Sequence, residues 1–442
     1  RNAGESGMDQ LSLMCRDTDF PPMSLDIYAT PGAKIKVTGT NPLIYTWRVD
    51  SPVKEQQEHN RFIEDSRDLW DEFQRLAIKE RSMRSASEAE RKALRTKSDS
   101  ISSIINQREL KLMKELPISN VWMEKLLRLS MSLKYNSRFT NKEEILALYD
   151  RLNKEQKASI EGQEIRVSLF PPKTVKEGDD MADADLFDLD GKVHHLADFK
   201  GKYMLLDFWS SGCGPCIMAL PEMKEIQEQY KDRLTIISLS SDTQTRWKAA
   251  SAQHEMTWQN LSDLKQTAGL YAVYDVNGIP NYVLISPEGK IVKMWSGYGK
   301  GSLKLKMRRY LDAPKREMSI TGDTNKKVVN YPSFESTNTD ILEVKQVELT
   351  DTATIVHFYA YYIPKYWIQV SVNAKLVDEQ GASYTLQKAD GITPGKHFFL
   401  PESGEAEFSL TFKPLPLKTK SFNFTEGTAK NDWQINGIKL TR

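Results

Sequence analysis

Hydrophobic and polar positions follow four different patterns along the chain, and each pattern predicts a different kind of structure. Residues 1–50 contain short apolar or alternating runs, such as 33–37, which predict a small N-terminal β region. Residues 51–164 are rich in charge, poor in glycine, and carry apolar side chains at helical spacing, so a helical region is expected. Within it, Thr140 and Glu143 have the spacing of a capping box that begins a helix.

The third pattern, over residues 165–315, alternates apolar runs with amphipathic segments. The runs 203–208 and 234–239 are apolar enough for buried parallel strands. Residues 282–295 predict a strand, a turn and a second strand. This order favours an α/β domain with a central mixed sheet flanked by helices. Helical patterns are expected after Cys213 and at 247–254, 264–273 and 303–311.

The last pattern, over residues 330–442, is rich in β-branched and aromatic residues and is divided by turn signals. Seven short strand-like segments of this kind predict a C-terminal β-sandwich. Residues 315–330 combine basic residues with glycine and aspartate and are expected to form a linker. The sequence therefore predicts a multidomain protein in which an α/β domain lies between an N-terminal β/helical region and the sandwich.

Composition and charge narrow the classes of function. The chain has 442 residues, with 61 Lys and Arg against 60 Asp and Glu, a net charge of +1. This balance argues against nucleic-acid binding, which requires a basic surface. No stretch approaches the roughly 20 apolar residues of a membrane helix. The first residue is Arg1 and no hydrophobic targeting segment is present, which is typical of a processed chain or of one whose beginning lies outside this sequence.

The strongest chemical signal is the run D-F-W-S-S-G-C-G-P-C at residues 207–216. Cys213 falls between a predicted strand and a predicted helix, where the helix N-terminus stabilises a thiolate. Cys216 follows one helical turn later, close enough to attack a mixed disulfide formed by Cys213. Gly214 and Pro215 fix the short link between the two cysteines.

A metal site is not expected at this cysteine pair. Zinc needs two further ligands, and the remaining candidates are Cys15 and the pair His194 and His195, none of which repeats a suitable spacing. Cys15 is expected to be a small buried residue or an idle thiol, and the histidine pair is expected at the surface. With three cysteines in the whole chain, a scaffold held together by disulfides is excluded.

The motif resembles that of the thioredoxin superfamily. Pro221, five residues after Cys216, matches the proline that kinks the family's active-site helix, and residues 278–280 match its G-I-P segment, whose proline is cis. The run 186–202 resembles the additional N-terminal hairpin of the TlpA/ResA-like branch, within the AhpC/TSA-redoxin clan. Members of that branch are extracytoplasmic bacterial thiol–disulfide oxidoreductases. The resemblance covers residues 165–315.

The resemblance implies catalytic roles for three residues. Cys213 and Cys216 would form the redox-active pair, and Asp207 matches the buried carboxylate beneath it. Burial would raise the pKa of Asp207, so that this carboxyl could exchange a proton with Cys216. The alternative for Asp207 is a strand-end residue that caps the following turn.

The resemblance also implies a surface that contacts the substrate. A cis peptide before Pro280 would expose the backbone of Ile279 for pairing with an extended substrate segment. The positions implied in this surface are Trp209, Gly214, Pro215, Ile279 and Pro280. An ordinary core tryptophan is the alternative for Trp209.

One departure from the ResA-like pattern bears on the substrate. Those proteins carry a glutamate shortly after the second cysteine, where this chain has Ala219, and Glu222 follows six residues after Cys216. This difference argues against a specific role in cytochrome c maturation. Gly214 and Pro215 between the cysteines resemble thioredoxin itself, which favours a reducing pair.

We therefore expect a thiol–disulfide oxidoreductase that reduces protein or small-molecule disulfides without a dissociable cofactor. Its electrons would come from an upstream thiol reductant, membrane-embedded if the protein is extracytoplasmic as the resemblance implies. A peroxiredoxin is a second possibility, although Leu206 and Ser210 stand where that family has proline and threonine. The third is a non-catalytic scaffold, supported by the large flanking regions. An aromatic cluster of the last region forms either a ligand platform or a sandwich core: Phe358, Tyr359, Tyr361, Tyr362, Tyr366 and Trp367.

Overall fold

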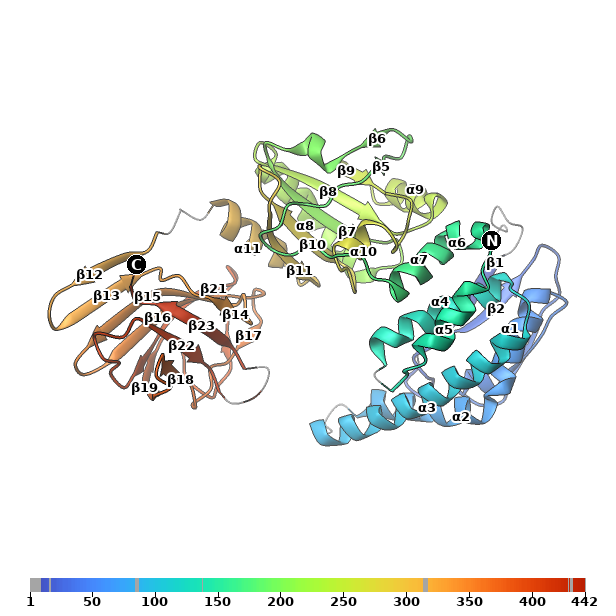
Figure 1. Cartoon of the computed structure of the whole chain (residues 1–442), viewed down its shortest axis with the longest axis horizontal. Coiled ribbons are helices and arrows are strands. Elements are labelled where there is room, and N and C mark those ends of the chain that lie inside the picture. The colour runs from blue at the N-terminus through green and yellow to red at the C-terminus, as the bar shows by residue number, and fades with distance from the viewer. Residues whose placement is uncertain are drawn as a thin grey trace. The chain divides into compact units, whose positions relative to one another are not determined.

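The computed structural model in Figure 1 describes residues 9–15, 17–83, 87–136, 138–312, 317–427, 429 and 432–441. These residues form two compact units. The first unit comprises the described residues up to Val175 together with Ser262–Asp275. The second comprises Lys176–Leu261 and the described residues from Val276 onward.

The first unit begins with two antiparallel strand pairs. Strand β1 (Asp9–Leu13) pairs with β2 (Leu25–Ala29), and β3 (Lys36–Thr38) pairs with β4 (Arg48–Asp50). A 3-10 turn, η1 (Ile44–Thr46), lies between β3 and β4. The part of the expected β region that lies at residues 1–8 is outside the described residues.

Helices follow the strand pairs, as the helical spacing predicted. Their bounds are α1 (Lys54–Asp65), α2 (Arg67–Ser82), α3 (Glu88–Glu115), α4 (Asn120–Tyr135), α5 (Lys142–Asp150), α6 (Lys154–Ala158) and α7 (Ile160–Leu169). Apolar side chains of α1, α3, α4, α5 and α7 share one core, in which Phe62, Trp122 and Leu126 are fully buried. The expected capping box at Thr140 is wrong. Helix α5 begins at Lys142 with Asn141 as its N-cap, and the Asn141 side chain donates a hydrogen bond to Glu144.

The helix expected over 264–273 is largely absent. Only α10 (Leu270–Val273) is helical, and Leu264 has a positive φ of 57°. The carboxylate of Asp263 explains the difference, because it accepts hydrogen bonds from the backbone N–H groups of Lys265 (3.0 Å) and Leu270 (2.7 Å). These side-chain bonds compete with a regular helical ladder.

The second unit contains a five-stranded sheet in the order β11-β10-β7-β8-β9. Its strands are β7 (Tyr203–Trp209), β8 (Leu234–Ser240), β9 (Gln259–Leu261), β10 (Asn281–Ile285) and β11 (Ile291–Ser296). Strands β7, β8 and β9 pair in parallel, whereas β10 pairs antiparallel with both of its neighbours, β7 and β11. The mixed sheet predicted from the apolar runs is therefore present.

Helices and a hairpin complete this part of the unit. They are α8 (Gly214–Tyr230), α9 (Gln244–Gln253), α11 (Ser302–Met307) with a π-helical turn (Arg308–Asp312), and the hairpin of β5 (Leu186–Phe187) and β6 (Val193–His194), followed by η2 (Leu196–Phe199). Helices α8 and α11 share a core with one face of the sheet, through side chains such as Leu205, Met223 and Leu303. This packing fixes the start of α8 against the end of β7.

The C-terminal part of the second unit is a large curled sheet. Ten strands are hydrogen-bonded in one order, β12-β13-β15-β16-β21-β19-β18-β22-β23-β14, and β17 pairs separately with β20. Side chains from strands far apart in this order, such as Val329 of β13 and Ile438 of β23, share one buried core. The expected β-rich region is present, but its hydrogen bonds are continuous rather than divided between two separate sheets.

The bounds of these strands are β12 (Ser319–Gly322), β13 (Lys326–Asn330), β14 (Ser336–Thr337), β15 (Leu342–Thr350), β16 (Thr354–Tyr361), β17 (Trp367–Ile368), β18 (Lys375–Asp378), β19 (Ser383–Asp390), β20 (Phe398–Phe399), β21 (Glu405–Phe412), β22 (Ser421–Thr425) and β23 (Gln434–Lys439). The linker expected at 315–330 is wrong for the described residues, because β12 and β13 form a hairpin at one edge of the sheet. Lys315 and Arg316 lie outside the described residues.

The aromatic cluster of this region divides between the core and the surface. Phe358 is fully buried in the core, whereas Tyr366 and Trp367 are 56% and 47% exposed. Among the described residues, no helix combines the length and the apolar character needed to cross a membrane.

Candidate active site

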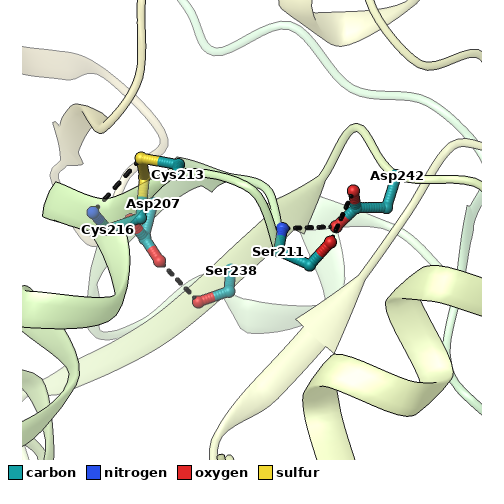
Figure 2. The surroundings of a disulfide bond; sticks show 6 residues. All are labelled: Asp207, Ser211, Cys213, Cys216, Ser238 and Asp242. Atoms are coloured by element: carbon teal, nitrogen blue, oxygen red, sulfur yellow. Dashed lines mark hydrogen bonds between the residues drawn. A yellow bond between two sulfur atoms is a disulfide. The ribbon is translucent and has the colours of Figure 1, made fainter. Parts of the chain in front are cut away.

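The cysteine pair lies where β7 gives way to α8. Cys213 is the N-cap of α8, and its Sγ is bonded to Sγ of Cys216 in a disulfide (Figure 2). The backbone N–H of Cys216 donates a hydrogen bond to Sγ of Cys213 at 3.2 Å. Pro215 in the first turn of α8 is compatible with a helix start, because the N–H it lacks has no partner within the helix. The helix N-terminus therefore points a backbone donor at the sulfur on which a thiolate would form.

The two sulfur-bearing residues differ in exposure. Cys213 is 9% exposed and Cys216 is 2% exposed. Gly214 and Pro215 beside them are exposed, and Met218 is 68% exposed. An approaching molecule would therefore meet Cys213 before Cys216, with small or apolar side chains around it.

Asp207 lies in β7, two residues before the strand ends, and is 2% exposed. Its carboxyl accepts a hydrogen bond of 2.8 Å from the Ser238 hydroxyl of β8, as Figure 2 shows. Burial raises the pKa of Asp207 to about 7, and the hydrogen bond from Ser238 opposes that rise. Because this bond runs to a neighbouring strand rather than to a turn N–H, it does not support the alternative of a turn cap.

Asp242 anchors the loop that leads to the cysteines. Its carboxylate accepts hydrogen bonds from the backbone N–H of Ser211 at 2.6 Å and from the Ser211 hydroxyl at 3.0 Å (Figure 2). Neither Asp242 nor Ser238 was identified from the sequence. The available signal was their position at the end of the apolar run of β8, because the carboxyl ends of adjacent parallel strands meet at one edge of a sheet.

The peptide bond between Ile279 and Pro280 is cis, as the resemblance implied. Asn281 of β10 is the cross-strand partner of Phe208, so Pro280 lies beside the end of β7 from which the cysteine loop departs. Pro280 is buried and Ile279 is half-buried. The carbonyl of Pro280 accepts a hydrogen bond from the N–H of Gly297 at 2.8 Å, which ties this segment to β11.

Trp209 does not form a wall of a contact surface in this structure. Its side chain is fully buried, so the alternative of a core tryptophan is the one observed. Ala219, which stands where ResA-like proteins carry a glutamate, is also fully buried. Glu222 is buried as well, but its carboxylate is bound at the start of α11.

The other candidate residues are not gathered into a site. Cys15 is a free, half-buried cysteine of the first unit, with Sγ 3.5 Å from Asp17. His194 of the hairpin is paired with Asp188 at 2.9 Å. His195 is more exposed than His194, as expected for a surface position. No group of three potential metal-binding side chains occurs within the ranges that the structure describes.

Comparisons with known proteins find related sequences over this part of the chain. The model of the AhpC/TSA family matches residues 178–294. The thioredoxin-like protein YneN of Bacillus subtilis is 30% identical over 121 residues, which cover 26% of this chain and 69% of that protein. The thiol-disulfide oxidoreductase ResA of Geobacillus thermodenitrificans is 31% identical over 139 residues, which cover 31% of this chain and 79% of the relative. The chain covers a smaller share, 61%, of the ResA of Bacillus cereus, at 33% identity.

Solved structures of similar sequence are also known. A thioredoxin domain of a thiol-disulfide oxidoreductase from Bacteroides vulgatus is 30% identical, with 28% of this chain and 91% of that chain covered and a TM-score of 0.27. A thiol:disulfide interchange protein from Bacteroides sp. is 28% identical, with 32% and 93% covered and a TM-score of 0.30. Since both scores are low, the assignment rests on the sequence relatives. The chain belongs to the TlpA/ResA-like branch of the thioredoxin superfamily.

Proposed function

We propose that this protein reduces disulfides of proteins or small molecules by dithiol–disulfide exchange through Cys213 and Cys216. The observation that carries the proposal is the placement of the pair at the start of α8, with Cys213 more exposed than Cys216. The more exposed sulfur at a helix N-terminus suits the attacking thiolate, and the more deeply buried sulfur three residues later suits the resolving one.

The exchange balances as two successive thiolate attacks. In the dithiol form, the Cys213 thiolate attacks one sulfur of the partner disulfide, which forms a mixed disulfide and releases a partner thiolate. The Cys216 thiol then loses its proton and attacks Sγ of Cys213, which breaks the mixed disulfide and releases the second partner thiolate. Two electrons pass to the partner, and the Cys213–Cys216 disulfide remains.

Asp207 serves as the proton acceptor for Cys216 in this proposal. A general base works best when its pKa lies near the working pH. Burial raises the pKa of Asp207 to about 7, which suits this role. The partner would lie against Gly214, Pro215 and the Ile279–Pro280 segment beside the cysteine loop.

The cycle requires a reductant but no dissociable cofactor. A dithiol protein would reduce the disulfide and restore the starting form, with a membrane-embedded donor suited to an extracytoplasmic enzyme. We propose the extracytoplasmic location on the family resemblance.

Cysteine variants test the proposal. Cys213→Ser should abolish reduction of a model disulfide such as insulin, whereas Cys216→Ser should retain the mixed disulfide, seen as a covalent adduct by mass spectrometry. Cys15→Ser is the matched control and should leave the rate unchanged. If Cys213→Ser kept full activity, the proposal would fail and the scaffold interpretation would replace it.

A further inference from the structure

A chain of two hydrogen bonds runs from Trp258 through Ser238 to Asp207. The indole Nε1–H of Trp258, which directly precedes β9, donates to Oγ of Ser238 at 2.8 Å. The Ser238 hydroxyl donates to Oδ2 of Asp207 at 2.8 Å. Asp207 and Ser238 are cross-strand partners of the parallel strands β7 and β8, so the sheet itself sets this arrangement.

All three side chains are removed from water. Ser238 is fully buried, Asp207 is 2% exposed and Trp258 is 7% exposed. Hydrogen bonds in such an interior are electrostatically stronger than in water, and a missing partner is correspondingly costly. The hydrogen bonding of each of the three side chains therefore depends on the other two rather than on solvent.

In the ionised form of Asp207, the direction of both hydrogen bonds is fixed by chemistry. An indole N–H donates only, whereas a serine hydroxyl donates one proton and accepts at its oxygen. Because an ionised Asp207 can only accept, the single hydroxyl proton of Ser238 points at Asp207 while Trp258 donates to the Ser238 oxygen. Donation to a carboxylate is stronger than donation to a neutral carboxylic acid, so this arrangement favours the ionised form of Asp207.

The other titratable groups near Asp207 are a neutral phenol, a cysteine held in a disulfide and one carboxylate that is bound elsewhere, and the pKa of Asp207 responds to burial and to Ser238. Tyr282 of β10 is its cross-strand partner on the other side, and burial raises the pKa of that phenol so that it stays neutral. Cys216 of α8 is held in the disulfide. Glu222 of α8 interacts with Tyr282, but its carboxylate is bound by Tyr298 and by backbone N–H groups of α11.

We propose that Ser238 and Trp258 are positioning residues that hold a directed hydrogen bond on Asp207 and thereby set the pH at which this carboxyl gains or loses its proton. The inference rests on the proposed function to the extent that Asp207 accepts the proton of Cys216. Ser238 acts directly on the carboxyl, and Trp258 acts through Ser238.

The titration of Asp207 can be measured without any activity. In the oxidised protein, the ¹³C resonance of the labelled aspartate carboxyl is followed against pH and assigned by its loss in Asp207→Asn. Ser238→Ala should raise the midpoint of Asp207 by about one to two pH units, because a hydrogen bond to the charged form is lost. Trp258→Phe should raise the Asp207 midpoint by less. Ser238→Thr, which keeps a hydroxyl, should leave the midpoint close to that of the wild type.

The controls separate this role from a general loss of stability. Ser251→Ala removes another buried hydroxyl, which donates to the Trp247 carbonyl at 2.6 Å, and should leave the midpoint of Asp207 unchanged. Adding Trp258→Phe to Ser238→Ala should produce little further shift, because the link between Trp258 and Asp207 is already broken. An unchanged midpoint in Ser238→Ala would overturn the proposal.

The pH profile of disulfide reduction provides the second measurement. If the pH profile shifts together with the Asp207 midpoint in Ser238→Ala, Ser238 and Trp258 govern the exchange reaction. If the midpoint shifts and the pH profile does not, Ser238 and Trp258 have no part in disulfide exchange, and the inference fails for that reaction. If the wild-type protein reduces no disulfide, the proposed function fails, while the titration still decides whether Ser238 and Trp258 control Asp207.

Discussion

The carboxylate of Glu222 accepts a hydrogen bond from the backbone N–H of Gly301 at 2.8 Å and so joins the active-site helix to the N-terminus of α11. The same carboxylate accepts from the backbone N–H of Lys304 at 2.7 Å and from the hydroxyl of Tyr298 at 2.9 Å. Gly301 is the N-cap of α11 and Lys304 lies in its first turn, where backbone N–H groups have no partner within the helix. Glu222 thus supplies, from another helix, the cap that α11 lacks in its own sequence.

Replacing Glu222 by glutamine should therefore destabilise the second unit by about 1–3 kcal/mol. The amide turns donors toward N–H groups that are themselves donors, and the helix N-terminus loses a favourable negative charge. Chemical unfolding of the oxidised protein, with amide hydrogen exchange in α11 as the local probe, measures the effect. Glu225→Gln is the matched control, because Glu225 of the same helix is 60% exposed and pairs with Lys304 at the surface. Equal effects of the two substitutions would contradict this account of Glu222.

Asp207 should make the stability of the second unit fall as the pH rises from about 4 to about 7. Its pKa is about 7 in the folded protein and about 4 in an unfolded chain. Between these values the folded state holds more protons than the unfolded state, so the free energy of unfolding decreases with increasing pH. The loss of stability is absent below about pH 4 and complete above pH 7. Because the two pKa values differ by about three units, the free energy of unfolding falls by about 4 kcal/mol over this range.

Asp207→Asn tests this expectation because an amide does not titrate. The variant should lose the downward slope between about pH 4 and pH 7 and should gain stability relative to the wild type above pH 7. Chemical unfolding at several pH values, with the disulfide intact, measures the slope. Asp188→Asn, at an exposed hairpin, is the control and should keep the slope. A variant that followed the wild-type curve would show that Asp207 is ionised throughout this range.

The first unit should respond to acid through His59, which is 6% exposed and has both ring nitrogens without a hydrogen-bond partner. Burial and the nearby Lys125 and Arg128 lower the pKa of His59 to about 3. An unfolded chain takes up this proton near pH 6.5, so stability is complete above that pH and is lost as the pH falls toward 3. The ring lies against Tyr28, with centroids 5.4 Å apart, which leaves no room for solvation of a charge.

His59→Phe should remove this acid sensitivity, since a phenyl ring fills similar space and takes up no proton. Amide hydrogen exchange in α1 and α4 between pH 4 and pH 7 reports the stability of the first unit by itself. The substitution His397→Gln, at an exposed histidine, should leave the exchange rates in α1 and α4 as in the wild type. Retained acid sensitivity in His59→Phe would assign the effect to another group.

The apolar runs and the cysteine motif made the central sheet and the redox pair predictable from the sequence. Strand β7 lies buried between β10 and β8, so nearly every position along it is apolar, and that pattern is visible locally. The start of α8 was equally visible, because Cys213, Gly214 and Pro215 lie directly after the strand. Both features depend on neighbours in the sequence.

Residues that act across strands were not predictable in the same way. Ser238 meets Asp207 because β7 and β8 pair in one particular register, and the two residues are 31 positions apart. The missing helix near residue 264 depends on one carboxylate, that of Asp263, which binds backbone N–H groups that a helical pattern would assign elsewhere. Neither relationship leaves a periodic signal, since each depends on a single polar contact.

Asp242 should control how firmly the loop before Cys213 is held. Its carboxylate accepts the Ser211 N–H at 2.6 Å, and Asp242→Ala leaves that donor without its partner. A hydrogen bond to a charged group contributes about 1.5–3 kcal/mol, so amide exchange at Ser211 should accelerate by about 10- to 100-fold while the strands of the sheet stay protected. Asp188→Ala removes comparable backbone hydrogen bonds from the β5–β6 hairpin and should leave Ser211 unaffected. Because a loosened loop positions Cys213 less firmly, we also expect slower disulfide exchange in Asp242→Ala. Unchanged amide exchange at Ser211 would show that the backbone alone holds the loop, and this slower disulfide exchange would then not follow.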